Sequence, residues 1–145
     1  MNISSVQTSS LSSSLGPKKI IGVEGGAILE YTHGKLKDLY QHDPVRIVFP
    51  TQSFGDINQA VVVTTAGGLT GGDRIKIDVS LKDGSHVLVV AQAAEKIYRS
   101  AEFDTCVDIN LATGVDCWLE YLPQETILFD GARLRRNMKV DIHPS

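Results

Sequence analysis

Three short segments of this 145-residue chain combine residue types that could do chemistry. In chain order they are residues 67–73, 92–100 and 122–133, which read GGLTGGD, QAAEKIYRS and LPQETILFDGAR. The first is glycine-rich and ends in a carboxylate. The second brings together an amide, a carboxylate, two cations, a phenol and a hydroxyl, and the third carries two carboxylates followed by arginine. Each lies between alternating apolar and polar stretches, which predicts loops held by strands.

The four glycines of segment 67–73 permit positive φ and a close approach of the backbone. Such loops can present N–H groups to an anion. Phosphate binding is disfavoured, because the Walker pattern requires Lys and then Ser or Thr where Asp73 and Arg74 stand, and a strand pattern follows. We therefore expect a connection between two strands, in which Asp73 accepts hydrogen bonds from loop N–H groups.

The second segment lacks the partners that catalysis would need. Ser100 has no histidine nearby in the sequence, and no G-x-S-x-G elbow is present. Glu95 and Arg99 are four residues apart and would pair if this segment formed a helical turn. We expect a partly exposed loop that presents polar groups to a partner.

In the third segment, Pro123 is expected to end the preceding strand or to place it at a sheet edge, and Asp130-Gly131 to form a hairpin turn. The arginines that follow are typical of a solvated face or of a protein contact. A hydrolase is a further alternative, since Glu120 and Glu125 could converge to the separation of about 5 Å that a retaining glycosidase uses.

Metal-binding residues are scattered rather than grouped. The histidines at positions 33, 42, 86 and 143 show no pairing at helical or H-x-H spacing, so a stable metal site is not expected and each is predicted at the surface. Two cysteines, Cys106 and Cys117, are too few for a disulfide framework. Single nickel ligands could converge only through the fold.

The charge and the hydropathy of the chain argue against two classes of protein. A net charge of −3 argues against nucleic-acid binding, and no apolar run reaches the roughly 20 residues that span a bilayer. Residues 1–18 are rich in serine and are predicted to be a disordered tail. No export signal is recognised there, so the cytoplasm is expected.

The pattern from residue 19 onward predicts an all-β domain. Residues 74–81 alternate strictly between apolar and polar, which is typical of a half-buried strand, and Asp83-Gly84 predicts a hairpin to a strand at 86–91. Residues 115–122 are apolar on both faces and are predicted to lie between two layers. A bulge is expected at Arg136 and Asn137, and residues 93–99 could instead form a helical turn. Further strands are predicted at 27–31, 35–40, 45–49, 60–65, 107–111 and 134–142, with no repeat of fixed length.

As a combination and in this order, the three segments resemble those of the UreD/UreH family of urease accessory proteins. The match runs from about Gly34 to the end of the chain. Ala91 stands where the family often has threonine before the second segment. Family members continue well beyond the arginine-rich strand, so residues 19–145 look like the N-terminal part of one such domain, with an incomplete core and an open edge strand.

The resemblance implies packed antiparallel and mixed sheets in a β-helix-like arrangement. It also implies a non-enzymatic scaffold that helps to deliver nickel to apo-urease, with a second scaffold protein and a GTPase as partners and with no tightly bound cofactor. A β-rich small-molecule or carbohydrate-binding module is the alternative. Structural motif residues would be Gly67, Gly68, Gly71, Gly72, Pro123 and Phe129. Candidates for partner binding or nickel passage are Asp73, Gln92, Lys96, Tyr98, Arg99, Ser100, Glu125 and Asp130.

Overall fold

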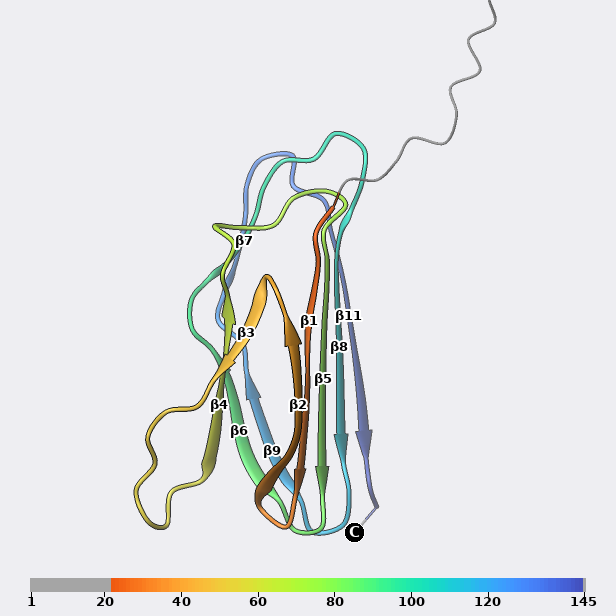
Figure 1. The fold of residues 1–145 in the computed structure, drawn as a ribbon. Coiled ribbons are helices and arrows are strands. Elements are labelled where there is room, and N and C mark those ends of the chain that lie inside the picture. The colour runs from red at the N-terminus through yellow and green to blue at the C-terminus, as the bar shows by residue number, and fades with distance from the viewer. Residues whose placement is uncertain (1–21, 145) are drawn as a thin grey trace, which may run out of the picture.

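The computed structural model describes residues 22–144, and these form strands and loops without a helix (Figure 1). The predicted tail, residues 1–18, lies outside the described residues. The part of the chain that is described therefore has no helix that could cross a membrane. In order, the strands are β1 Glu24–Thr32, β2 Lys35–His42, β3 Val45–Val48, β4 Asn58–Thr64, β5 Arg74–Lys82, β6 His86–Ala91, β7 Glu95–Ile97, β8 Thr105–Thr113, β9 Trp118–Leu122, β10 Thr126–Leu128 and β11 Leu134–Ile142.

The strands form three sheets. The five-stranded sheet has the order β11-β8-β5-β1-β2, the four-stranded sheet β3-β4-β6-β9, and the two-stranded sheet β10-β7. Within the described residues, β1 with β2 and β3 with β4 pair antiparallel, and the other strand pairs are parallel. Figure 1 shows the two larger sheets side by side, with β1, β5, β8 and β11 running opposite to β4, β6 and β9.

The chain adds one strand to each sheet in the same order several times over, and we call each such round a pass. The strands β5, β6 and β7 make one pass, β8, β9 and β10 make the next, and β11 returns to the five-stranded sheet. Paired positions such as Ile75 and Val107 stand about 30 residues apart, a spacing within the range of repeat architectures. The sequence hides this spacing because the first pass, from β1 to β4, also contains the additional strands β2 and β3 and a longer loop. The β-helix-like label goes beyond these pairings and stays a prediction.

The alternation of apolar and polar residues predicted from the sequence shows which side chains form the core. In β5 the side chains of Ile75, Ile77, Val79 and Leu81 are buried, and Val107, Ile109 and Leu111 of β8 lie beside them. The four-stranded sheet contributes its own buried row, which includes Val45, Val62, Val87 and Val89. Each fully buried aliphatic side chain stabilises the fold by about 2 kcal/mol. The all-β prediction and the half-buried strand at 74–81 are confirmed.

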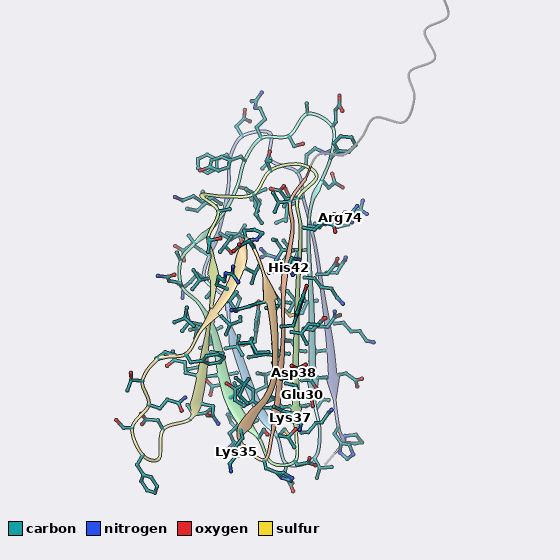
Figure 2. The ribbon with its side chains drawn as sticks, viewed as in Figure 1. Glu30, Lys35, Lys37, Asp38, His42 and Arg74 are labelled. Carbon is teal, nitrogen blue, oxygen red and sulfur yellow. The ribbon has the colours of Figure 1, made fainter. Side chains whose placement is uncertain are left out.

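Charged side chains lie along β2, which is an edge strand of the five-stranded sheet, and on the outer face of that sheet. Figure 2 shows Lys35, Lys37 and Asp38 along β2, with Glu30 on β1 close by. Glu30 pairs with Lys82 of β5 at 3.1 Å. Charged side chains on an edge strand disfavour pairing with another chain. All four histidines are exposed, as predicted.

Two predicted hairpins are wrong. Asp83-Gly84 does form a turn, with φ values of 52° and 67°, but it joins β5 to β6 in a different sheet. Asp130-Gly131 likewise joins β10 of the two-stranded sheet to β11 of the five-stranded sheet. An Asp-Gly pair favours the tight backbone conformation, but it does not fix which strand the chain pairs with next. Here the parallel partner from the previous pass takes that place.

Three other local predictions are also corrected. Residues 115–122 are not covered on both faces, because β9 is the edge of the four-stranded sheet and Trp118 and Leu122 are exposed. There is no bulge at Arg136, since β11 pairs with β8 in unbroken register from Leu134 to Ile142. Residues 93–99 contain strand β7 rather than a helical turn. Pro123 does follow the end of β9.

The edge strand β11 carries an apolar row that has little cover. Met138, Val140 and Ile142 are 50%, 53% and 69% exposed, although their partners Ile109 and Leu111 in β8 are buried. Within the described residues, β8 has a strand partner on each side, β5 and β11, whereas β11 is paired with β8 alone. This is the open edge that the resemblance implied.

Thr105 gives a stability prediction within the core. Its side chain is fully buried and its hydroxyl has no hydrogen-bond partner in residues 22–144. Thr105→Val removes this unpaired hydroxyl at nearly constant volume, so we expect the free energy of unfolding to rise by about 1 kcal/mol. Urea denaturation would measure the change. Ser85→Ala is the contrasting variant, because the Ser85 hydroxyl donates to the Lys82 carbonyl at 2.6 Å and should cost stability when lost. A fall in stability for Thr105→Val would contradict the assignment.

Candidate functional site

The three segments singled out from the sequence lie at the same end of the molecule and are bonded to one another. The backbone N–H of Leu69 donates to the carbonyl of Lys96, and that of Tyr98 donates back to Leu69. The N–H of Phe129 donates to the carbonyl of Ile97 at 3.1 Å. The middle segment is therefore held between the other two, and we call this arrangement the stacked loops (residues 66–73, 92–104 and 123–133).

An aromatic pair lies on the outer surface of the stacked loops. The rings of Tyr98 and Phe129 are stacked, with centroids 4.9 Å apart and an interplanar angle of 22°. The Tyr98 hydroxyl donates to the Gly67 carbonyl at 3.3 Å. A Cβ at Gly68 would stand 2.3 Å from the Tyr98 ring, so this position requires glycine. Tyr98 and Phe129 are 41% and 43% exposed, which leaves both rings available for contact.

Ion pairs tie the same loops together. Arg99 pairs with Asp130, across the second and third segments. Asp104 accepts from Arg133 at 2.9 Å and from Arg135 at 3.2 Å. The hydrogen bond from Arg133 lowers the pKa of Asp104, assisted by the charges of both arginines. Arg133 and Arg135, which the sequence pattern assigned to a solvated face or a protein contact, are thus paired within the chain.

Asp73 and Gly71 hold the first loop against its neighbours. The carboxylate of Asp73 accepts the backbone N–H of Thr70 at 2.8 Å and that of Val23 at 2.9 Å, as its place in the sequence predicted for the loop. A Cβ on Gly71 would overlap the Ser100 hydroxyl at 1.8 Å. The Gly72 N–H donates to the Asp104 carbonyl. These contacts make the loop a packed element rather than an open cradle for an anion.

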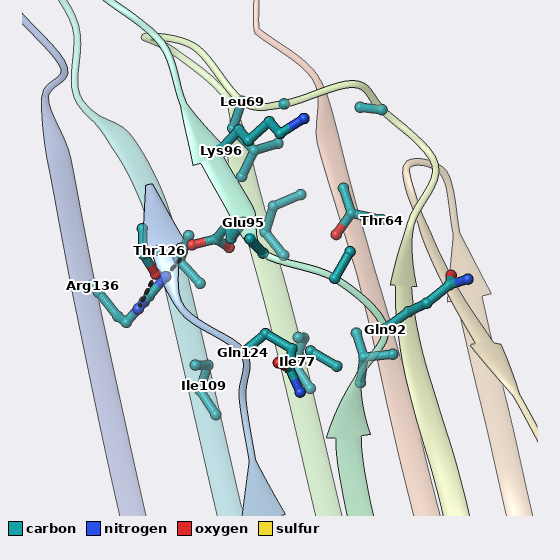
Figure 3. Close-up of a pocket in the computed structure, with 18 of the residues that line it drawn as sticks. Thr64, Leu69, Ile77, Gln92, Glu95, Lys96, Ile109, Gln124, Thr126 and Arg136 are labelled. Carbon is teal, nitrogen blue, oxygen red and sulfur yellow. Dashed lines mark hydrogen bonds and ion pairs between the residues drawn. The ribbon is translucent and has the colours of Figure 1, made fainter. Parts of the chain in front are cut away.

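Beside the stacked loops, a cavity of about 340 Å³ lies between the sheets (Figure 3). Aliphatic side chains of both larger sheets form much of its wall, among them Ile77, Ile109 and Val90. Its polar lining comes from Thr64, Gln92, Glu95, Lys96, Gln124, Thr126 and Arg136. Among the described residues that line it, Glu95 is the one acidic side chain.

An ion pair occupies one end of this cavity. Arg136 of β11 pairs with Glu95 of β7 and donates to the Thr126 hydroxyl at 3.1 Å. The pairing of Glu95 with Arg99, expected if this segment formed a helical turn, does not occur, because residues 95–97 form a strand and Arg99 pairs with Asp130 instead. Burial raises the pKa of the Tyr121 phenol, which also lines the cavity, and the nearby charges of Arg136 and Glu95 act on it in opposite directions.

The residues predicted from the sequence divide between the two features. All lie within the stacked loops, but Gln92 and Lys96 line the cavity, whereas Tyr98, Arg99, Ser100 and Asp130 do not. Glu125 is exposed, and its carbonyl accepts the Glu95 N–H at 2.9 Å. Neither it nor Asp73 lines the cavity, and the part of each in binding or passage stays a prediction. No three His, Cys, Asp or Glu side chains of residues 22–144 are grouped so as to hold a metal ion.

Sequence reasoning missed Glu95, Thr126 and Arg136 as a set. The alternation of side chains in β7 could have placed Glu95 in the interior. Ile97 is fully buried, and Glu95, two residues earlier, lies on the same face of the strand. No sequence signal joins Glu95 to Arg136, since they meet only where β11 returns to the five-stranded sheet.

Comparison with known proteins finds relatives over most of the chain. A family model described as UreD urease accessory protein matches residues 24–145. A protein from Magnetococcus marinus named urease accessory protein UreD is 46% identical over 123 residues, which are 82% of this chain and 43% of that protein. Proteins of the same name from Chelativorans sp. and Brucella suis are 44% and 36% identical, and the match covers 74% and 88% of this chain but 39% and 46% of theirs.

The chain thus spans less than half the length of these curated relatives. The family model nevertheless covers nearly all the residues that the structure describes, including all three segments of the stacked loops. The chain belongs to the UreD family of urease accessory proteins.

Proposed function

We propose that this chain acts in urease maturation as a non-enzymatic scaffold in the cytoplasm. It would help to deliver nickel to apo-urease in a complex with another accessory scaffold and a GTPase. Membership of the UreD family supports this role. Nucleotide hydrolysis would belong to the partner, in keeping with a first loop that has Asp73 and Arg74 where a P-loop has Lys and Ser or Thr.

The observation that carries the proposal is the surface of the stacked loops. Tyr98 and Phe129 present stacked, half-exposed rings, and the pair formed by Arg99 and Asp130 lies in the same two segments. Aromatic side chains and arginine are enriched where proteins bind one another. These groups are fixed by backbone hydrogen bonds between the loops, so little ordering would be needed on binding.

Nickel passage would use the cavity beside these loops. Its lining offers amide and hydroxyl oxygens from Gln92, Gln124 and Thr126, while the Glu95 carboxylate is paired with Arg136 and Lys96 adds a second cation. Nickel accepts oxygen ligands, and a few such groups would hold it weakly enough to let it leave. In this proposal nickel is cargo, and the chain holds it only in transit.

Co-purification tests the scaffold role. The tagged chain would be expressed with the urease subunits and the accessory proteins, and the recovered complex would be assayed for partners and for urease activation. We expect partners with the wild-type chain, and at least a tenfold lower recovery for the Tyr98→Ala/Phe129→Ala double variant, because aromatic anchors carry much of the binding energy. Phe54→Ala is the matched control, since Phe54 is fully exposed in the distant loop between β3 and β4.

Equal recovery of the double variant and the wild-type chain would contradict the assigned surface. Recovery of the chain alone would be followed by the same experiment on a chain extended to the length of the relatives. Failure of the extended chain as well would overturn the scaffold proposal.

A further inference from the structure

We propose that a groove at the end of the molecule away from the stacked loops binds an extended peptide of a partner protein, one that carries an acidic residue beside an apolar one. The groove goes beyond the scaffold role proposed above by adding a second contact surface. Its two walls are the β1–β2 turn and the loop between β3 and β4. Figure 1 shows both at the opposite end of the larger sheets from β7.

The groove has a volume of about 380 Å³ and a mixed lining. Leu36, Phe49 and Pro50 give it apolar surface, and Gln52 and Asn58 give it amide groups. An amide offers both a donor and an acceptor, which is what the backbone of an extended peptide requires. Recognition of this kind takes affinity from main-chain hydrogen bonds and specificity from the contacts of side chains. The apolar part of the lining would receive the apolar side chain of the peptide.

The hydroxyl of Tyr31 is the strongest sign of a ligand. Tyr31 is 3% exposed and lines the groove, and its phenol makes no hydrogen bond to residues 22–144. The one fully enclosed unpaired side-chain oxygen or nitrogen of that range belongs to Thr105, so the Tyr31 hydroxyl reaches the surface, and the groove is where it does so.

This hydroxyl is a donor without an acceptor in the described chain. Burial raises the pKa of the Tyr31 phenol, which therefore stays protonated. Phenylalanine would fill the same space without a nearly buried, unpaired polar group. A carbonyl oxygen of a bound peptide would supply the missing acceptor.

Charge selects the acidic residue of the peptide. Lys35 is the single charged residue of the lining, and its ammonium group pairs with no carboxylate of residues 22–144. Figure 2 shows Lys35 at the start of β2, beside the β1–β2 turn. An incoming carboxylate would meet this cation without having to displace another acidic group, so the groove favours an acidic segment over a basic one.

Both walls are fixed by hydrogen bonds. In the turn, the Gly34 N–H donates to the Ser85 hydroxyl at 3.1 Å, and the Gly34 carbonyl accepts from the Asn58 amide at 2.8 Å. In the loop, the Ser53 N–H donates to the Asp56 carboxylate at 2.8 Å. The groove is therefore formed before a peptide arrives, which lowers the entropy cost of binding.

Selection of peptides on the purified chain tests the groove. Short random peptides displayed on phage would be depleted on the Tyr31→Phe/Lys35→Gln double variant and then selected on the wild-type chain, so that the sequences recovered depend on these two residues. We expect them to share an Asp or Glu beside a large apolar residue. The most frequent sequence would be synthesised with a fluorescent label, and its binding measured by fluorescence anisotropy.

Each single variant has its own expected result. Tyr31→Phe should weaken binding of this peptide at least about fivefold through the loss of one hydrogen bond. Lys35→Gln should weaken it about threefold at low salt, and the difference should vanish at high salt because the ion pair is exposed. Tyr40→Phe and Lys37→Gln are the matched controls, since both residues are exposed on β2 but do not line the groove, and both should bind like the wild-type chain.

Recovery of no peptide after depletion would overturn the groove, as would recovered sequences without an acidic residue or equal losses for the control variants. Tyr31→Phe should also leave the unfolding midpoint in urea unchanged or raised. A lowered midpoint, or a variant that does not fold, would show that the hydroxyl is bonded within the chain and would overturn the assignment as well. Because the selection needs neither urease nor nickel, a failed groove and a failed scaffold role are separate results.

Discussion

Asp73→Ala is expected to lower the free energy of unfolding by about 3 kcal/mol, because it leaves two backbone N–H groups without their acceptor. The Asp73 side chain is 6% exposed, so water cannot readily replace the carboxylate. One oxygen accepts from Thr70 within the loop, and the other accepts from Val23, which precedes β1. Chemical denaturation would measure the loss. Asp73→Asn should cost roughly half as much, since its amide keeps one acceptor oxygen.

The same variant separates a structural role for Asp73 from a direct one. Under the scaffold proposal, urease activation should fall while the apo-urease protein stays abundant. If Asp73 acts only by fixing the loop, the loss of activation will follow the loss of folded chain across Asp73→Asn and Asp73→Ala. Unchanged stability of Asp73→Ala would contradict the hydrogen bonds assigned here, and normal activation would exclude a need for Asp73 in maturation.

Gly71→Ala is expected to have an effect of similar size, about 3 kcal/mol of destabilisation, through overpacking. A Cβ at this position would lie 1.8 Å from the Ser100 hydroxyl oxygen and 2.4 Å from the Phe103 carbonyl oxygen. The serine could turn away, but the carbonyl belongs to the backbone of the middle loop. Relief of the overlap would therefore separate the first two of the stacked loops. The unfolding midpoint in urea would report the change.

Gly67→Ala is the matched control for this prediction. A Cβ at Gly67 meets no atom within 4 Å, so we expect a change within about 0.5 kcal/mol. Adding Ser100→Gly to Gly71→Ala should recover only part of the lost stability, because the overlap with the Phe103 carbonyl remains. Equal stability of the Gly67 and Gly71 variants would show that the loops are not packed as described.

Strand positions were predictable because they follow from local alternation. Ile75, Ile77 and Val79 needed only a period of two to be placed on a buried face, and the structure buries them. The partner of each strand was not predictable in the same way. Asp83-Gly84 specifies a tight turn whether the next strand folds back beside β5 or crosses to another sheet, and the crossing occurs. That choice depends on strands a whole pass away.

The same holds for the candidate site: features set by neighbouring residues could be predicted, and contacts between distant residues could not. The stacked loops could be recognised as segments from their glycine and charged residues, and the acceptor role of Asp73 followed from its place beside glycines. The pairing of Glu95 with Arg136 could not be foreseen, because these residues are 41 positions apart and meet through a cavity formed by three sheets. The spacing of four residues offered Arg99 as a partner of Glu95 only if the segment were helical, whereas residues 95–97 form a strand and Arg99 pairs with Asp130.

The parallel pairing between passes also sets how such a chain can fold. Only the β1–β2 and β3–β4 pairs join strands that are neighbours in the described sequence. Elsewhere in the larger sheets, a strand finds its partner about 30 residues or more away, and pairings of that kind close long loops and form slowly. We therefore expect the β1–β2 hairpin to form before the rest of the five-stranded sheet, and each later strand to pair with a strand of the preceding pass. On a ribosome, assembly would keep pace with synthesis, one pass at a time.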